Sequence, residues 1–132
     1  MQQPIVISGA GILGCYISCA LSLQGIDSIV LEKKDDEVED SVRTITLNPF
    51  SKNLLDKIGI ENDYSMINKM EVKDFDGTGK IVFKSSEIGM DHLAYVSDFA
   101  TLLMAVRKKA SEKILYKEEI IDIDNKGDLN EV

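Results

Sequence analysis

Short apolar runs and a helical apolar spacing follow one another at the start of the chain. The run Ile5–Ile7 predicts a strand, and the apolar spacing over residues 12–23 predicts a helix that ends at Gly25. A second apolar run, residues 28–31, predicts another strand and leads directly to Glu32. A strand, a helix and a strand in this order predict a βαβ unit with parallel strands.

The next part of the chain is a charged stretch, and an alternating apolar pattern and a helical pattern follow it. Residues 33–48 begin with a run of almost continuous charge, which predicts a solvated loop, and end with apolar alternation over residues 41–47. Asn48 and Pro49 predict the first turn of a short helix, because asparagine caps a helix and proline fits its first position. Gly59 ends this helix. Its expected apolar face comprises Phe50, Leu54, Leu55 and Ile58.

Two alternating runs on either side of an Asp-Gly turn predict a β-hairpin. The runs are residues 70–75 and 80–84, the turn is residues 76–79, and the whole excursion covers residues 69–84.

A third helix is expected from Ser97 and Asp98 to about Ala110, with cations at residues 107–109 that suit the helix dipole. Residues 114–116 then predict a strand parallel to the first. The apolar positions of the helix are Phe99, Leu102, Leu103 and Val106.

The end of the chain predicts further strands. Alternation over residues 119–124 predicts one strand, residues 125–128 a turn, and residues 129–132 the start of a partner strand. Because natural domains avoid unpaired strand edges, we expect the chain to be the N-terminal part of a longer protein. The elements together predict one α/β domain over residues 1–132. It has a Rossmann-like βαβ unit with a parallel sheet, an inserted hairpin and an incomplete C-terminal end.

Glycines at three spaced positions lie between the first strand and the first helix. Gly9 permits a tight turn, Gly11 lets backbone N–H groups approach a pyrophosphate, and Gly14 lets helix and strand pack closely. The pyrophosphate would lie at the positive end of the helix, whose first N–H groups have no partner in the helix. The alternative is a βαβ unit with a tight turn and no ligand.

Glu32 follows Gly14 by 18 residues, close to the spacing expected for a ribose ligand. A carboxylate there accepts hydrogen bonds from two ribose hydroxyls and repels a 2′-phosphate, which disfavours NADP as the tightly held ligand. It does not separate FAD from NAD. The alternative is a surface glutamate.

Composition narrows the classes of partner. The chain carries 15 basic and 23 acidic residues and a formal net charge of −8, which argues against nucleic acid or an anionic membrane as a direct partner. No apolar run is long enough to cross a bilayer, and the N-terminus is unlike a signal peptide, so we expect a cytoplasmic protein.

Cysteine and histidine, two common metal-ligating residue types, are few in this chain. Cys15 and Cys19 are spaced by four residues, not as a CxxC pair, and are expected to pack as small hydrophobic side chains. His92 has no cysteine or histidine partner, so no metal site is expected, and a surface or cap histidine is the simpler interpretation. No acid–base pair stands out, and the catalytic residues stay unassigned.

Several segments resemble the FAD-dependent aromatic hydroxylases of the ubiquinone-biosynthesis type, relatives of p-hydroxybenzoate hydroxylase. Beyond the glycine motif, residues 40–47 are similar to the family's Asp-x-Arg-x-x-x-Leu segment, and residues 51–60 to its Ser-x-x-Leu-Leu-x-x-x-Gly helix. Residues 70–77 and 93–96 fall in the family's order and spacing. The chain departs from the family at Ser97-Asp98, where Glu-Asn is frequent, and lacks the downstream Asp-Gly and Gly-Asp flavin motifs.

The resemblance implies roles for particular residues. Glu32 would bind the adenosine ribose of FAD, with Lys33 among the cofactor-binding residues, and Arg43 would lie near the ribityl and pyrophosphate groups. Alternatively, Arg43 is a loop arginine paired with a nearby acid. The residues expected to hold the pyrophosphate are Gly9, Ala10, Gly11, Ile12, Leu13 and Gly14. The acids near Arg43 are Asp36, Glu39 and Asp40.

The resemblance also implies a reaction for the full-length protein. Flavin reduced by NAD(P)H would use O₂ to hydroxylate a phenolic or prenylated quinone precursor, in association with the inner membrane or with other biosynthetic enzymes. The chain alone is expected to bind FAD weakly or not at all and not to hydroxylate. Two alternatives remain. An NAD-dependent oxidoreductase would continue with βαβ repeats after Glu32, and a non-enzymatic nucleotide-binding module would be complete at this length.

Overall fold

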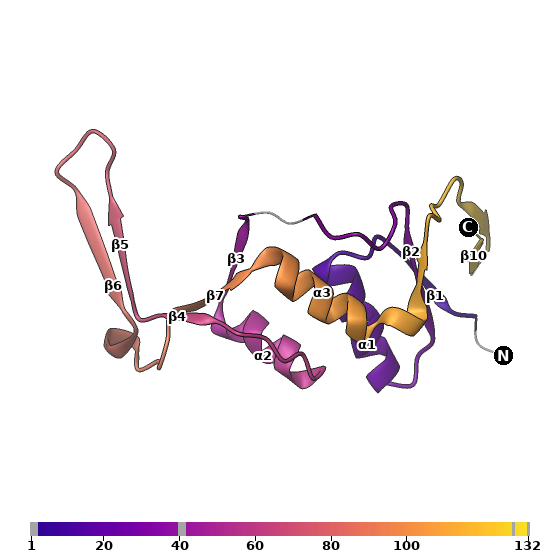
Figure 1. The fold of residues 1–132 in the computed structure, drawn as a ribbon, viewed down its shortest axis with the longest axis horizontal. Coiled ribbons are helices and arrows are strands. Elements are labelled where there is room, and N and C mark those ends of the chain that lie inside the picture. The colour runs from indigo at the N-terminus through magenta and orange to yellow at the C-terminus, as the bar shows by residue number, and fades with distance from the viewer. Residues whose placement is uncertain (1–2, 40–41, 128, 132) are drawn as a thin grey trace. The chain divides into compact units, whose positions relative to one another are not determined.

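The chain divides into two units in the computed structural model, which describes residues 3–39, 42–127 and 129–131 (Figure 1). The first unit comprises the described parts of Met1–Ser41 and Ala100–Val132, and the second comprises Val42–Phe99. Four residues of the segments predicted above lie outside the described residues: Asp40, Ser41, Asp128 and Val132.

The first unit begins with the predicted βαβ arrangement. Strand β1 (Ile5–Ser8), helix α1 (Ile12–Leu23) and strand β2 (Ser28–Glu32) follow one another, and β1 and β2 pair in parallel. Strand β8 (Ile114–Tyr116) pairs in parallel with the other edge of β2, which gives the order β1-β2-β8. The predicted α/β class and the parallel sheet are confirmed.

The core of this unit lies where α1 and helix α3 (Phe99–Lys109) bury their apolar faces. The hydroxyls of Ser18 in α1 and Ser28 in β2 lie 2.9 Å apart, and both residues are fully buried. Cys15 and Cys19 are free thiols buried in α1, which fits the packing role expected from their small size. Val30, Leu102 and Val106 are also fully buried.

The end of the first unit differs from the prediction. Only Asp124 of the expected strand 119–124 lies in a strand. The apolar side chains of Ile121 and Ile123 are 91% and 60% exposed, so their alternation does not correspond to a buried face. Strand β9 (Asp124–Lys126) covers the first two residues of the expected turn and pairs antiparallel with β10 (Leu129–Glu131). A partner strand does begin at residue 129, as predicted.

The second unit contains an antiparallel sheet that the sequence did not reveal. Its order is β3-β7-β4, from strands Thr44–Leu47, Ala94–Asp98 and Ser65–Ile67. Ser97 and Asp98 therefore end strand β7 and do not start α3, because they pair with Ile45 and Thr44. Strand β3 lies within the stretch predicted as a charged loop, at its alternating end.

Helix α2 (Pro49–Lys57) and the hairpin were predicted correctly as elements. Asn48 caps α2, and its Oδ1 accepts a hydrogen bond of 2.7 Å from the N–H of Ser51. Leu55 is buried, but Phe50 is 72% exposed, so Phe50 does not belong to the buried face. The hairpin pairs β5 (Lys69–Lys73) with β6 (Lys80–Lys84), and every residue of β5 is exposed. A short 3₁₀ helix (Ser85–Ile88) follows β6, and another (Ser111–Lys113) precedes β8.

His92 in the second unit contacts the side chains of Asn68 and Tyr95. Its Nδ1 lies 2.6 Å from Oδ1 of Asn68, and its ring meets the ring of Tyr95 edge-on. Among the described residues, no cluster of histidine, cysteine and acidic side chains is arranged to bind a metal ion. Within the same residues, no helix combines the length and the apolar character needed to cross a bilayer.

Candidate functional site

The glycine turn joins β1 to α1 in the first unit. Gly9 has φ +99°, a conformation that side chains with a Cβ rarely adopt, and its N–H donates to the Leu31 carbonyl at 2.7 Å. A Cβ on Gly14 would collide with the carbonyl oxygen of Gly9, so the close approach of α1 to the turn requires glycine there. A Cβ on Gly11 would meet nothing within 4 Å. The first and third glycines therefore serve the fold, whereas the second faces open space.

Helix α1 begins without a side-chain cap. Gly11 is the N-cap residue, and no side chain bonds to the first N–H groups of the helix. These N–H groups have no partner within the helix and lie at its positive end. Ile12 and Leu13, which carry two of them, are half-buried and exposed, respectively. The arrangement can receive an anionic oxygen through backbone donors.

Glu32 is directed at this turn and not into solvent. Its Oε2 accepts a hydrogen bond of 2.9 Å from the N–H of Ala10, a fully buried residue of the turn. Its Oε1 accepts one of 3.1 Å from the N–H of Lys34. A carboxylate has about four acceptor positions, so Oε1 keeps capacity for a further donor. The structure thus brings the predicted acid and the predicted turn together.

Arg107 of α3 completes this cluster, and sequence reasoning missed it. Its Nε donates to the carbonyl oxygen of Ala10 at 2.8 Å, and its Nη2 lies 3.7 Å from Oε2 of Glu32. The side chains of Arg107 and Glu32 are only 12% and 13% exposed. The cations of residues 107–109 suit the helix dipole, yet Arg107 follows Leu103 by four residues and so lies on the buried face. The spacing of Arg107 from Leu103 is the sequence feature that indicates its place on the buried face.

The environment of Glu32 favours its charged form. Burial alone would raise the pKa of Glu32, but the backbone N–H groups of Lys34 and Ala10, together with the Arg107 guanidinium, lower the pKa below its ordinary value. Glu32 is therefore an anion at neutral pH and acts as a hydrogen-bond acceptor only.

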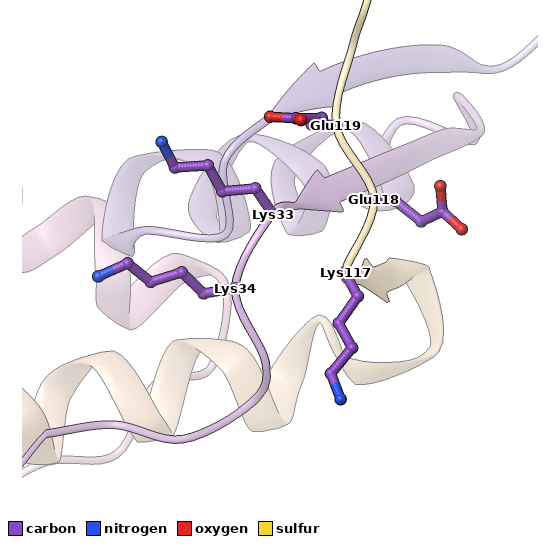
Figure 2. A pocket seen from close by; sticks show the side chains of 5 residues that line it. All are labelled: Lys33, Lys34, Lys117, Glu118 and Glu119. Carbon is purple, nitrogen blue, oxygen red and sulfur yellow. The ribbon is translucent and has the colours of Figure 1, made fainter.

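A cavity of about 310 Å³ lies beyond the carboxyl ends of β2 and β8 (Figure 2). The backbone pairing of the two strands continues to this point, since the N–H of Lys117 donates to the Lys34 carbonyl and the N–H of Glu118 to the Glu32 carbonyl, both at 3.1 Å. In Figure 2 the side chains of Lys33 and Lys34 extend to the left and that of Glu118 to the right. Ligands of open α/β sheets bind outside the carboxyl ends of the strands. The cavity is lined by Lys33, Lys34, Lys117, Glu118 and Glu119.

Arg43 lies in the second unit, directly before β3. Its guanidinium carbon is 4.2 Å from the ring centre of Phe99, and its carbonyl accepts a hydrogen bond from the Phe99 N–H. This stacking holds the guanidinium against Phe99, the residue that follows β7 and begins α3. Its role toward a cofactor stays a prediction from the resemblance.

Comparisons with known proteins agree with this geometry. A family model described as an FAD binding domain matches residues 2–120. Among solved structures, p-nitrophenol 4-monooxygenase PnpA from Pseudomonas putida is 16% identical with a TM-score of 0.77, over 97% of this chain and 35% of its own. HpxO from Klebsiella pneumoniae, complexed with FAD and uric acid, is 18% identical with a TM-score of 0.73, over 97% and 34%.

A third similar structure is PqsL from Pseudomonas aeruginosa in complex with 2-aminobenzoylacetate. It is 19% identical with a TM-score of 0.77, over 93% of this chain and 35% of its own. At these identities the likeness establishes the fold. The chain spans about a third of the length of these proteins.

Proposed function

The chain belongs to the family of FAD-binding domains, and from this premise we propose that it is the FAD-binding portion of a flavin-dependent aromatic monooxygenase. The observation that carries the proposal is the bond from the Ala10 N–H to the Glu32 carboxylate. This bond holds an acid against a glycine turn whose helix has no side-chain cap. The acid would bind a sugar and the turn would bind a pyrophosphate, and these two groups are covalently joined in one dinucleotide ligand.

The residues of the first unit fit an adenosine diphosphate group. The backbone donors of the turn, Gly9 through Gly14, would bind the pyrophosphate, and the open space at Gly11 leaves room for it. Oε1 of Glu32 would accept from the ribose hydroxyls. The cavity that Lys33 lines is the proposed place for the adenosine end. Arg43 is proposed, from the sequence resemblance, as a donor to the pyrophosphate or ribityl group.

The reaction of the full-length protein is proposed from the family resemblance. When bound, FAD would supply the redox chemistry that activates O₂ for insertion into an aromatic ring, and the residues of this chain would bind and orient it. We further propose a phenolic or prenylated quinone precursor of ubiquinone as substrate and NAD(P)H as electron donor. Association with the inner membrane or with other biosynthetic enzymes is part of the same proposal. Of the similar structures, one is a p-nitrophenol 4-monooxygenase and another is a complex with 2-aminobenzoylacetate, and these aromatic compounds support an aromatic substrate class.

Titration of the chain with ADP, followed by backbone amide NMR, tests the binding proposal. We expect millimolar ADP to shift the amides of Gly9, Gly11 and Gly14, and Glu32→Gln to weaken ADP binding by about tenfold through loss of a charge-assisted hydrogen bond. The matched control is Glu71→Gln, which removes an exposed carboxylate of β5 and is expected to leave ADP binding unchanged. Absence of shifts at the three glycines would contradict the proposal.

A separate measurement addresses the flavin. The chain alone is expected to bind FAD weakly and to show no hydroxylase activity, because it spans only about a third of the similar enzymes. Stoichiometric flavin absorbance in the purified chain would overturn that expectation. Tighter binding of NAD⁺ than of FAD would favour a nicotinamide-dependent oxidoreductase.

A further inference from the structure

One buried guanidinium links the two halves of the candidate site. Arg107 on α3 donates through Nε to the Ala10 carbonyl, in the middle of the glycine turn, and lies beside Glu32 Oε2 at the end of β2. Glu32 in turn accepts from the N–H of the same Ala10. The three residues form a closed cycle in which both polar groups of the Ala10 backbone are bound by side chains from distant parts of the chain.

We propose that Arg107 is a positioning residue for nucleotide binding: by holding the Ala10 carbonyl and the Glu32 carboxylate together, it fixes the glycine turn relative to the acid. The proposal rests on the proposed function, since it assigns the turn to the pyrophosphate and the acid to the ribose. Arg107 has no direct contact with the ligand in this role. Its effect on affinity passes through Ala10 and Glu32.

The chemistry of arginine fits this role better than that of any other cation. A planar guanidinium presents several nitrogens in fixed directions, so Nε donates to the Ala10 carbonyl while Nη2 forms an ion pair with the Glu32 carboxylate. A lysine ammonium has a single nitrogen and cannot hold both in the same way. Because the guanidinium is nearly buried, its contacts are little screened by salt.

Stability alone does not explain this arginine. Among the described residues, its Nη1 is buried without a hydrogen-bond partner, so the guanidinium is incompletely satisfied. Buried ion pairs can often be replaced by apolar side chains without loss of stability. An apolar side chain at this position could not bind Ala10 and Glu32.

The experiment compares Arg107→Met, Arg107→Lys and the matched control Lys108→Met, which removes a neighbouring exposed cation of α3. The first readout is amide hydrogen exchange of Ala10 in the ligand-free chain, with the Val30 amide as internal reference. We expect Arg107→Met to speed Ala10 exchange at least tenfold more than Val30 exchange, and Lys108→Met to change neither. Equal acceleration at both amides means general destabilisation and overturns the proposal.

The second readout is a double-mutant cycle on ADP affinity. We expect Arg107→Met to weaken ADP about tenfold in the wild-type background and less than threefold in Glu32→Gln, because part of its effect passes through Glu32. The Arg107→Lys variant is expected to be intermediate, and it provides the test if the methionine variant does not fold. Equal effects in both backgrounds, or no effect on ADP, contradict the proposal.

The two proposals fail in different ways. If the wild-type chain does not bind ADP, the proposed function is wrong, and Ala10 exchange still decides whether Arg107 fixes the turn. If the wild-type chain binds ADP and Arg107→Met binds it equally well, only the role of Arg107 is wrong.

Discussion

Helices α1 and α2 begin in opposite ways, although each follows a short strand. At α2, the Asn48 side chain accepts from the N–H of Ser51, and Pro49 has no N–H to satisfy. At α1, Gly11 stands in the position of Asn48 and carries no side chain. At α2 a side chain of the protein accepts from one of the first N–H groups, whereas at α1 no side-chain cap accepts from the first N–H groups.

The difference leaves the start of α1 without a side-chain cap, as the proposed pyrophosphate site requires. Glu32 brings negative charge close to the start of α1, but it accepts from Ala10, which precedes the helix. The acid therefore stabilises the turn without occupying the donors of α1. A helix that only needed to be stable would carry a cap like that of α2, which is worth about 1 kcal/mol.

The largest expected effect concerns the third residue of each helix. Gly14→Ala should lower the free energy of unfolding by about 2–3 kcal/mol, because the new Cβ collides with the Gly9 carbonyl and the backbone must move. Ser51→Ala, at the matching position of α2, should change it by less than about 0.5 kcal/mol. Urea unfolding of both variants measures the difference. Equal effects would mean that α1 does not approach the turn as closely as described.

The second prediction gives α1 the cap that α2 has. Gly11→Ser has room for its side chain, so the stability of the chain should rise by a few tenths of a kcal/mol. ADP affinity should fall about tenfold, equal to about 1.4 kcal/mol, since the hydroxyl takes donors meant for the ligand. Thermal melting and ADP titration measure the two effects. Unchanged affinity would show that the N-terminus of α1 does not bind the pyrophosphate.

The third prediction removes the cap of α2. Asn48→Ala should cost about 1 kcal/mol of unfolding free energy, because the Ser51 N–H loses its acceptor. ADP binding should stay as in the wild type, which makes this variant the counterpart of Gly11→Ser. A loss of ADP affinity without loss of structure would argue against the assignment of the ligand to the turn of α1.

The smallest expected effect is the pH dependence contributed by Glu32. The pKa of Glu32 is lowered in the folded state by backbone N–H groups and Arg107, after the opposing effect of burial. Its stabilising contribution is therefore present above the unfolded-state value of 4.5 and is lost as pH falls through the folded value. The stability difference between wild type and Glu32→Gln should shrink between about pH 6 and about pH 3.

Glu71 of the hairpin provides the contrast for that measurement. Hydrogen bonds from Lys69 and Lys80 lower the pKa of Glu71, but this carboxylate is exposed and its partners are side chains. Salt should remove the pH dependence that Glu71 contributes and leave most of that from Glu32, whose partners are largely backbone groups in a buried turn. The same salt response for both acids would contradict the burial of Glu32.

Local patterns account for the features that the sequence predicted correctly. The βαβ unit follows from two apolar runs around a helical spacing, and Asn48 and Pro49 identify the start of α2. The arrangement of Glu32 at the turn follows from the parallel pairing that aligns Ser8 with Leu31. Each of these depends on neighbours in sequence or on one crossover connection.

The features that were missed depend on partners far along the chain. Arg107 binds Ala10 across 97 positions, and nothing near Arg107 indicates that contact beyond its place on a buried helix face. Strand β7 was not predicted because β3 and β4, its partners on either side, are separated in sequence from it and from each other. At Ile121 a strand was predicted and none is present, because the alternating apolar side chains there are exposed and cover no buried surface.

The burial of Cys15 has a consequence for redox chemistry. A cysteine in the first turn of a helix is ordinarily acidified by the helix dipole, which makes it reactive. Here burial raises the pKa of the Cys15 thiol to about 11, so that very little thiolate is present at neutral pH. Because peroxide attacks thiolates, this sulfur should resist conversion to sulfenic acid, although it directly follows the turn proposed to bind the pyrophosphate of FAD.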